Sequence, residues 1–343
     1  MSTPMMEAAV VRAFGAPLDV GPLPVPNPGP GQVLVRMEAT GVCHTDLHAA
    51  RGDWPIKPRL PFVPGHEGVG IIDAVGDDVA LFQRGDRVGV AWLHSACGHC
   101  EYCVGGWETL CEAQADTGYS VNGTFAEYAL AQASHVVPLP EEPDAAILAP
   151  LLCAGVTTYK GIRETEARPG QCLVVSGLGG LGHLAVQYGV AMGLRVFGVD
   201  ISPDKLALAE RLGAEGVFDG NAPGCVEQVR RATRGGGHGV LVTAVSPSAF
   251  SQSIGMARRG GTIALVGLPP GEFNTPIFDL VLRRITLRGS IVGTRNDLRE
   301  AVSIAMRAGI RPHLEVHRLH QINDVFARLH RGHVNGRVVI RFE

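Results

Sequence analysis

The chain has 343 residues, of which 45% are hydrophobic and 18% are charged. That balance supplies enough apolar material for buried cores and excludes global disorder. At about 150 residues per domain, the length indicates two domains. The formal net charge of −3 lacks the basic excess typical of nucleic-acid-binding proteins, so we expect no nucleic-acid partner.

The N-terminal sequence and the apolar runs favour a cytoplasmic protein. MSTPMMEAAV has no basic region followed by an apolar stretch, which a signal peptide would need. The longest nearly apolar run, 145–156, is interrupted by Pro150 and is shorter than the about 20 residues of a membrane span. We expect no membrane partner. In a reducing cytosol we expect the 8 cysteines to be metal ligands, catalytic groups or core residues rather than disulfides.

Residues 1–150 are predicted to form a β-rich domain. Gly and Pro turns separate short apolar or alternating runs typical of strands, namely VLVRME, VGIIDAVG, DRVGVAW and FAEYALA. The proline-rich segment 22–32 is predicted to be an extended surface connection.

From about residue 151, predicted strands alternate with predicted helices. The strands are QCLVVSG, LRVFGVD, GVFDG, GVLVTAV, GTIALVG and ITLRGSIVG, and the helices cover 180–192, 203–212, 223–234 and 247–258. This alternation predicts an α/β domain, 151–290, with a doubly wound parallel sheet of the nucleotide-binding kind. A further helix, NDLREAVSIAMRAG, and a last strand, GRVVIRFE, lie in 291–343, which we assign to the first domain and which would make that domain discontinuous.

A glycine-rich loop, GLGGLG, follows the strand LVVS and opens a predicted helix. Gly177 permits the tight turn, Gly179 lets a pyrophosphate approach the backbone, and Gly182 lets helix and strand pack closely. Gly180 and Leu181 complete the loop, and the helix N-terminus offers free N–H groups to a phosphate. We therefore predict a dinucleotide site; the alternative is a glycine-rich turn that binds no dinucleotide.

Asp200 ends the next predicted strand. Its carboxylate is expected to accept hydrogen bonds from the adenosine ribose hydroxyls and to repel a 2′-phosphate, which favours NAD over NADP. Lys205 is either a second contact to that ribose or a solvated helix lysine.

Four closely spaced cysteines predict a structural zinc site in the segment 95–112. Cys97, Cys100, Cys103 and Cys111 follow the spacing C-x2-C-x2-C-x7-C, and four thiolates close a tetrahedral site against substrate. An iron–sulfur cluster is the main alternative, but the bacterial ferredoxin run has x3 and a proline around its fourth cysteine. Four free thiols are the remaining interpretation.

CHTDLH and GHEGVG are the other two dense polar motifs, and they hold Cys43, His66 and Glu67. A catalytic zinc needs three protein ligands and one open position. The third ligand is then one of the remaining cysteines. Cys172 lies inside a predicted buried strand and Cys225 in a peripheral helix, whereas Cys153 lies near the domain junction, where a cofactor cleft would open. We therefore choose Cys153.

Together these motifs resemble the zinc-dependent medium-chain alcohol dehydrogenases, and most of all the tetrameric yeast-type and bacterial ethanol/propanol dehydrogenases. GVCHTDLHA, PGHEGVG, the CGHCEYC lobe, GLGGLG with VDISPDKL, VTAVSP and GRVVI agree in order and spacing over essentially the full length. The resemblance implies a GroES-like catalytic domain, a Rossmann domain, a cleft between them for zinc and nicotinamide, two zinc ions per chain, and a homotetramer.

The resemblance also implies roles for individual residues. Cys43, His66 and Cys153 bind the catalytic zinc, with Glu67 as an alternate ligand, and Asp46 orients the liganding histidine. Thr45 touches the substrate oxygen and passes its proton through the nicotinamide ribose to His48, which delivers it to solvent. Contacts to the cofactor and substrate come from further residues: His44 and Arg337 to the pyrophosphate, Val245 and Val266 beside the nicotinamide, and Trp54 and Trp92 as walls of a narrow substrate slot.

Simpler interpretations exist for most of these side chains. His44 and His48 taken singly are typical surface residues, Asp46 is also a good helix N-cap, and Arg337 is also explained as an edge-strand charge. Glu67 has the alternative role of a structural arginine partner, and the tryptophans that of core residues.

The expected reaction is the reversible oxidation of primary alcohols to aldehydes by hydride transfer to NAD, with short-chain alcohols first and aromatic ones as further candidates. Three alternatives remain open at this point. They are a zinc-free quinone or enoyl reductase on the same scaffold, a polyol or formaldehyde dehydrogenase, and a zinc-binding scaffold without turnover.

Overall fold

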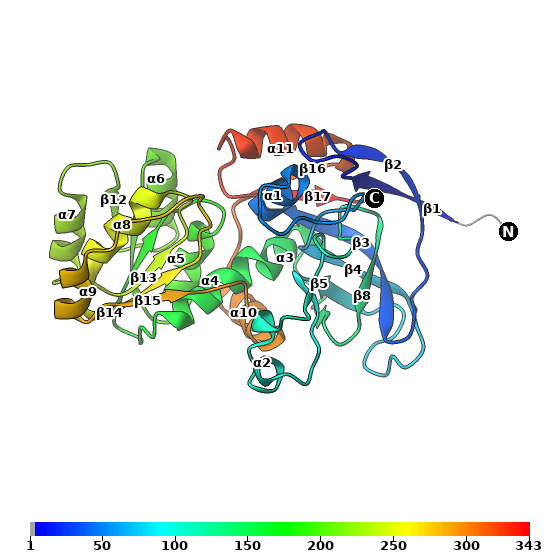
Figure 1. Cartoon of the computed structure of the whole chain (residues 1–343), viewed down its shortest axis with the longest axis horizontal. Coiled ribbons are helices and arrows are strands. Elements are labelled where there is room, and N and C mark those ends of the chain that lie inside the picture. Colours follow the sequence, from blue (N-terminus) through cyan, green and yellow to red (C-terminus); the bar gives the residue numbers. More distant parts are fainter. Residues whose placement is uncertain (1–3) are drawn as a thin grey trace. The chain divides into compact units, whose positions relative to one another are not determined.

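The computed structural model describes residues 4–343, which form two compact units (Figure 1). The first unit comprises the chain up to Cys153 together with Thr294–Arg299 and His313–Glu343. The second comprises Ala154–Gly293 and Glu300–Pro312. The first unit is therefore assembled from segments at both ends of the chain.

A seven-stranded sheet forms the centre of the first unit. Its order is β16-β17-β3-β4-β5-β9, and β8 also pairs with β3. The strands are β3 (Gln32–Val42), β4 (Gly68–Val75), β5 (Arg87–Val90), β8 (Tyr128–Gln132), β9 (Val137–Pro138), β16 (Leu314–His317) and β17 (Arg337–Arg341). The last strand, β17, pairs antiparallel with β3, so the C-terminal segment completes the sheet of the N-terminal segment.

Smaller elements surround this sheet. Two short two-stranded sheets are β1 (Met5–Val10) with β2 (Asp19–Pro24), and β6 (Leu93–Ser95) with β7 (Ala115–Asp116). The helices are α1 (His44–Arg51), α2 (Glu101–Val104), α3 (Ala145–Leu148) and α11 (Ile322–His330), with the 3-10 turns η1 (Glu108–Leu110), η2 (Ala149–Leu152) and η3 (Leu319–Gln321). The proline-rich segment begins inside β2, so only its later part is the irregular connection that we expected.

The second unit contains a six-stranded parallel sheet of order β12-β11-β10-β13-β14-β15. The strands are β10 (Cys172–Ser176), β11 (Arg195–Asp200), β12 (Gly216–Asp219), β13 (Gly237–Val242), β14 (Ala257–Leu265) and β15 (Thr286–Gly289). Each contains residues from one of the predicted apolar runs, which confirms the doubly wound α/β expectation. These sequence segments are apolar without interruption, because a parallel sheet covered on both faces buries both sides of its strands.

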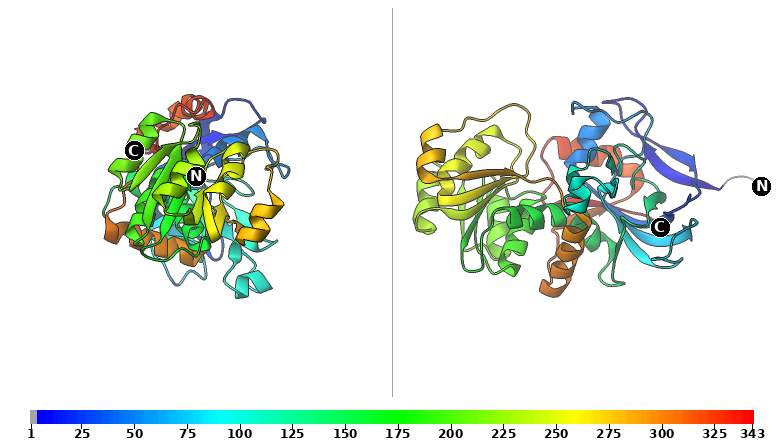
Figure 2. Two further views of the ribbon diagram at one scale, coloured as in Figure 1. Left: turned by 90° about the vertical axis from the view of Figure 1, so that its left-hand side faces the viewer. Right: turned by 60° about the horizontal axis from the view of Figure 1, so that its bottom comes forward.

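Helices cover both faces of this sheet (Figure 2). They are α4 (Ala154–Glu164), α5 (Gly182–Ala191), α6 (Pro203–Arg211), α7 (Cys225–Ala232), α8 (Pro247–Met256) and α9 (Ile277–Arg283), while α10 (Arg295–Ala308) begins in the first unit and ends in the second. α4 packs on α5, and α7 packs on α8. The strand order reverses direction at β10, and right-handed crossovers therefore place the two sets on opposite faces.

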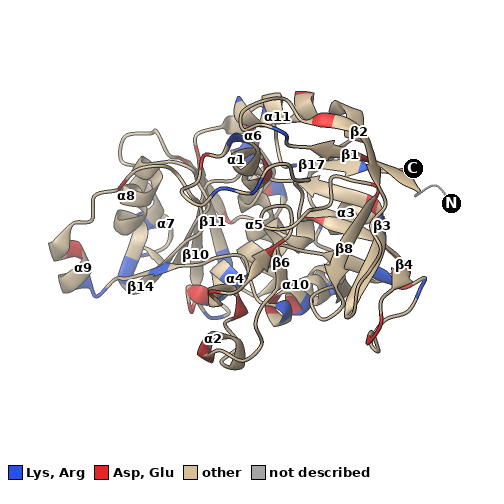
Figure 3. Ribbon diagram, turned by 45° about the vertical axis from the view of Figure 1, so that its right-hand side comes forward, with Lys and Arg blue, Asp and Glu red and all other residues tan. Residues whose placement is uncertain are grey.

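Basic and acidic residues are interspersed along the ribbon (Figure 3). Ion pairs within each unit join several of them; Arg195 of β11 lies 2.7 Å from Glu215, and Arg328 of α11 lies 2.7 Å from Glu315. Within residues 4–343 no single helix is long and apolar enough to cross a membrane, although the bent pair of Ala145–Leu152 and Ala154–Glu164 meets that criterion when both parts are joined.

Candidate active site and metal centres

Four buried side chains of the first unit converge on one point. Cys43, His66, Glu67 and Cys153 each offer a ligand atom, and these atoms all lie within 4.8 Å of one another. His66 Nε2 lies 3.3 Å from Cys153 Sγ. The structure therefore brings the chosen third cysteine to the cluster, whereas Cys172 lies in β10 and Cys225 begins α7.

Asp46 explains how Cys43 and His66 come together. α1 begins directly after Cys43, and one carboxylate oxygen of Asp46 accepts the Cys43 backbone N–H at 2.8 Å. The other oxygen accepts the Gly65 backbone N–H at 3.1 Å and lies 2.8 Å from His66 Nδ1. The side chain is 1% exposed, and from the third position of α1 it accepts the backbone N–H of the N-cap residue Cys43 and also directs His66 Nε2 toward the cluster. The interpretation of Asp46 as the N-cap residue is wrong, because Cys43 holds that position.

Asp46→Asn is expected to weaken metal binding at this cluster by about 10- to 100-fold, because the amide cannot fix the imidazole as a charged carboxylate does. The measurement is zinc retention during dialysis against a graded chelator. Asp73→Asn is the matched control, since it removes a carboxylate of the same unit that pairs with Arg84 instead. Equal zinc retention in the two variants would contradict the orienting role.

The donor set of the cluster fits zinc. Two thiols and one imidazole are ligands that zinc prefers, and three protein ligands leave one position open. The hydrogen bond with Cys153, helped by His66, holds the pKa of the Cys43 thiol well below its usual range despite burial, which favours the thiolate that binds a metal. Glu67 Oε2 is buried without a hydrogen-bond partner, so this oxygen could serve as a further metal ligand in the same cluster.

Arg337 forms a buried ion pair with Glu67. The arginine is 4% exposed, and one of its Nη groups donates to the other Glu67 oxygen. Burial raises the pKa of Glu67 to about 7, against the opposing effect of Arg337. Since β17 lies between β16 and β3, the interpretation of Arg337 as an edge-strand charge is wrong. The structure directs Arg337 toward Glu67, and its contact to a pyrophosphate stays a prediction.

The backbone of β3 passes close to this pair. A Cβ atom at Gly41 would lie 1.9 Å from Glu67 Oε2, so any side chain there would displace the carboxylate. Glycine is therefore required at this position for Glu67 to reach the cluster.

The four cysteines of the lobe 95–112 form a second cluster. The sulfur atoms of Cys97, Cys100, Cys103 and Cys111 all lie within 4.8 Å of one another. Backbone N–H groups, from His99 first and then from Cys100, lower the pKa of Cys97 to about 6, which favours its thiolate. The set is closed, because every ligand is a protein sulfur, and this is the pattern of a structural zinc site.

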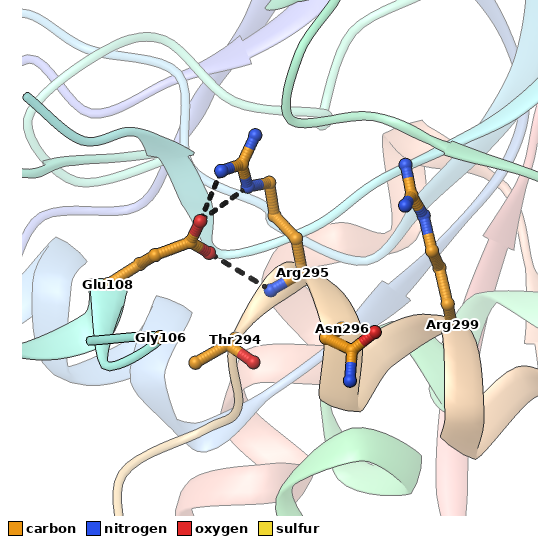
Figure 4. A pocket seen from close by; sticks show the side chains of 6 residues that line it. All are labelled: Gly106, Glu108, Thr294, Arg295, Asn296 and Arg299. Atoms are coloured by element: carbon orange, nitrogen blue, oxygen red, sulfur yellow. Dashed lines mark hydrogen bonds and ion pairs between the residues drawn. The ribbon is translucent and has the colours of Figure 1, made fainter. Parts of the chain in front are cut away.

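A carboxylate fixes the lobe to the start of α10. Glu108, in η1, is 7% exposed and accepts the Arg295 backbone N–H at 3.3 Å and its Nε–H at 2.7 Å (Figure 4). Arg295 Nη1 also donates to the Ser134 carbonyl. Burial raises the pKa of Glu108, but the hydrogen bonds from Arg295 outweigh it and leave that pKa lowered. A cavity of about 260 Å³ beside this pair is also lined by Gly106, Thr294, Asn296 and Arg299. The Arg295 backbone N–H, at the N-terminus of α10, is a donor that could bind an anion, and Glu108 already accepts it.

One aromatic ring contacts the first cluster, and two further large rings extend from it. The ring of Trp92 meets His66 edge to face at 5.2 Å between centroids, and the ring of Trp54 stacks on His48 at 5.8 Å. Tyr119 contacts both tryptophans, at 5.5 Å from Trp54 and 5.7 Å from Trp92. The sequence did not indicate Tyr119, because nothing in its spacing links it to either tryptophan. The two tryptophans and Tyr119 therefore form one cluster of three large rings, and the role of the tryptophans as walls of a substrate slot stays a prediction.

The remaining residues of the CHTDLH motif lie on α1. His44 is exposed and Thr45 is half-buried, both in the first turn. His48 lies three residues after Thr45, so the two side chains share a helix face. His48 Nδ1 lies 3.0 Å from Asp53 Oδ2. Asp53 is, after Tyr119, the second residue near the site that the sequence did not indicate.

The glycine loop lies in the second unit, between β10 and α5. Gly177 has φ +95°, and a Cβ there would lie 2.6 Å from the Ala244 backbone nitrogen. A Cβ at Gly182 would lie 1.9 Å from the Gly177 carbonyl oxygen, whereas a Cβ at Gly179 would meet nothing within 4 Å. Gly177 and Gly182 are therefore required by the fold, and Gly179 leaves open backbone, as a bound pyrophosphate needs. Gly180 and Leu181 lead directly into α5.

Asp200 lies beside this loop at the end of β11. One of its oxygens accepts the Leu178 N–H at 2.6 Å, and the other accepts the N–H groups of Ile201 and Ser202 at 2.8 and 3.0 Å. Asp200 thus ties the glycine loop to the turn before α6. Lys205 is partly exposed in α6, Val245 is 57% exposed after β13, and Val266 is partly buried after β14. These residues follow the carboxyl ends of parallel strands, the edge at which such sheets bind nucleotides.

Comparisons with known proteins agree with this geometry. Residues 29–141 match the family described as alcohol dehydrogenase GroES-like domain, and residues 180–307 match zinc-binding dehydrogenase. The chain is 58% identical to an alcohol dehydrogenase of Rhizobium meliloti over 98% of each chain. It is 51% identical to one of Geobacillus stearothermophilus over 98% of this chain and 100% of that one. Among solved structures, the alcohol dehydrogenase of Aeropyrum pernix superposes with a TM-score of 0.90 at 34% identity, covering 98% of this chain and 100% of the other.

Proposed function

The chain belongs to the zinc-dependent alcohol dehydrogenases of the medium-chain family, and we propose that it oxidises short primary alcohols reversibly to aldehydes, with NAD as hydride acceptor and two zinc ions per chain. We further propose that the first unit is the catalytic domain and the second the NAD-binding domain. A zinc ion held by Cys43, His66 and Cys153 would supply Lewis-acid chemistry that lowers the pKa of an alcohol hydroxyl, and NAD held by the glycine loop would supply the hydride acceptor.

The observation that carries this proposal is the buried cluster of Cys43, His66 and Cys153, with Glu67 as a further donor at the same point. Three protein ligands with an open position distinguish a catalytic zinc site from the closed four-cysteine site of the lobe. The residues around it supply what the chemistry needs. Trp54 and Trp92 exclude water and narrow the site, Thr45 Oγ1 takes the substrate proton, and His48 Nε2 passes the proton to solvent.

For the cofactor, we propose that the glycine loop and His44 bind the pyrophosphate and Asp200 the adenosine ribose, assisted by Lys205. Val245 and Val266 then flank the nicotinamide, and Arg337 contacts the pyrophosphate. The open backbone at Gly179 and the position of Asp200 beside the loop support this assignment.

A substrate panel tests the proposal. Zinc-replete protein is assayed with NAD and NADP against ethanol, propanol, benzyl alcohol, a polyol and formaldehyde with glutathione. We expect the highest kcat/KM for the short primary alcohols with NAD. A preference for the polyol or for formaldehyde would instead show one of the related dehydrogenases. Longer alcohols should still react, because an apolar slot discriminates by only about 1–3 kcal/mol per methylene.

Asp200→Asn is expected to raise the NADP/NAD ratio of kcat/KM by at least about tenfold, because the amide lacks the charge that repels a 2′-phosphate. The amide has one oxygen, so it keeps only part of the backbone hydrogen bonds that the two carboxylate oxygens accept. Asp200→Gly should loosen the preference further. Asp219→Asn is the matched control, since Asp219 is the register partner of Asp200 on the neighbouring strand β12. An unchanged ratio in the Asp200 variants would show that Asp200 does not select the cofactor.

We propose that the chain is a cytoplasmic homotetramer. All 8 cysteines are free, which suits a reducing compartment. Exposed apolar side chains on α9 support self-association, namely Ile277, Phe278, Val281 and Leu282, each at least 67% exposed.

A further inference from the structure

The turn Gly52–Trp54 folds back over His48 at the end of α1. Gly52 ends the helix in the left-handed conformation, with φ +67°, and a Cβ there would lie 2.9 Å from the Phe14 ring. The backbone N–H of Asp53 donates to the His48 carbonyl at 3.2 Å. Because glycine permits this sharp reversal, the two residues that follow it return to the His48 side chain.

Asp53 and Trp54 both contact the imidazole of His48. Asp53 Oδ2 lies 3.0 Å from His48 Nδ1, and the Trp54 ring stacks on the imidazole with an interplanar angle of 24°. Arg51 is the other charged group at this place, with Nε 3.5 Å from the same Asp53 oxygen, and its Nη1 contacts His330 of α11. One edge and one face of the imidazole are thus fixed, and Nε2 is the ring nitrogen without a hydrogen-bond partner among residues 4–343.

We propose that Asp53 is a positioning residue for the proton-transfer step: its carboxylate accepts the His48 Nδ1–H and so keeps Nε2 as the nitrogen that takes up and releases the proton. This inference rests on the proposed function, in which His48 delivers the proton to solvent. The proton balance is simple. Nε2 gains one proton and gives it to water, Nδ1 keeps its own, and Asp53 stays ionised throughout.

The position of Asp53 suits this role better than a stabilising one. The side chains of His48 and Asp53 are 28% and 38% exposed, and an ion pair so open to water contributes little to folding. The carboxylate still decides which nitrogen carries hydrogen, because a neutral imidazole has one donor and one acceptor.

Asp53→Asn is expected to lower kcat by about tenfold with little change in KM, because a general acid–base group contributes about 100- to 10,000-fold and positioning supplies part of that. The pH dependence of kcat should also differ from that of the wild type, because the nitrogen that carries hydrogen is no longer fixed by the carboxylate. Asp53→Glu, which keeps the charge, should recover part of the rate. Asp73→Asn, which removes the partner of Arg84, is the matched control and should keep the wild-type pH profile.

A double-mutant cycle separates this inference from the proton-transfer proposal itself. If Asp53 acts through His48, Asp53→Asn should have no further effect in the His48→Gln background. An equal loss in both backgrounds would overturn the positioning role. If His48→Gln alone behaves like wild type across pH, the proposed proton-transfer role of His48 fails. If His48→Gln is impaired while Asp53→Asn keeps the wild-type rate and pH profile, the inference about Asp53 alone fails.

A second readout needs neither cofactor nor turnover. In protein labelled with ¹⁵N-histidine, the His48 signals are identified by their loss in His48→Gln. We expect the nitrogen shifts of the Nδ1–H tautomer in the wild type and a mixture of both tautomers in Asp53→Asn. The Nε2–H tautomer in the wild type, or identical shifts in both proteins, would overturn the proposal.

Discussion

Cys43→Ser is expected to remove one of two zinc ions and to lower kcat/KM for ethanol by at least about 1,000-fold, because Lewis-acid activation supplies several kcal/mol of transition-state stabilisation. Cys43 is 6% exposed and lies at the start of α1, where its sulfur meets His66 and Cys153. A serine hydroxyl is a poor zinc ligand and leaves two protein donors and Glu67. Metal analysis and steady-state kinetics measure the two effects.

NADH binding separates loss of the metal from loss of the fold. The glycine loop and Asp200 belong to the second unit, so NADH affinity should remain close to that of the wild type. Cys172→Ser is the control, because it changes a cysteine that is 3% exposed in β10 and belongs to neither cluster. It should keep two zinc ions and most of the activity. A Cys43→Ser variant with two zinc ions and full turnover would refute the ligand assignment.

Cys111→Ser is expected to lower the melting temperature by about 10 °C, since a structural zinc contributes directly to folding energy. The lobe has little else to hold it together. α2 has no buried residue, and Val104, Trp107 and Leu110 are 75%, 44% and 46% exposed. The Glu108–Arg295 ion pair attaches this segment to the start of α10.

Calorimetry, zinc content and limited proteolysis test this second prediction. The variant should retain one zinc ion, at the cluster of Cys43, His66 and Cys153, and proteases should cleave first within 95–112. Cys225→Ser, a buried cysteine of α7 outside both clusters, is the control for the loss of a thiol. An unchanged melting temperature together with two zinc ions would show that the lobe does not depend on a metal.

The sequence was most informative where one physical signal dominates. The strands of the second unit are buried on both faces and appear as uninterrupted apolar runs between helices, so their existence and order were predictable. The spacing of Cys97, Cys100, Cys103 and Cys111 likewise indicates one closed site, because close thiolates wrap a single ion. We did not predict α11, although it carries apolar residues at the helical interval, with Ile322, Val325, Phe326 and Leu329 buried.

Other features depend on contacts that spacing cannot show. β2 contains two prolines and is recognisable only through its pairing with β1. Glu67 and Arg337 are 270 residues apart, and their ion pair follows from the pairing of β17 with β3. Asp53 and Tyr119 join the site through a tight turn and a ring cluster, neither of which has a periodic signal. The motifs and the family resemblance therefore indicated the ligands and Asp46, whereas the contacts of Asp53 and Tyr119 required the tertiary structure.

Anomalous diffraction at the zinc absorption edge, measured on crystals of the wild-type protein grown with zinc, tests the central claim most directly. We expect two peaks per chain, one bonded to Cys43, His66 and Cys153 and the other to the four sulfur atoms of the lobe, at the usual zinc–sulfur distance of about 2.3 Å. A structure with a peak in the lobe but none at Cys43, His66 and Cys153, obtained from protein that still oxidises ethanol, would contradict the account.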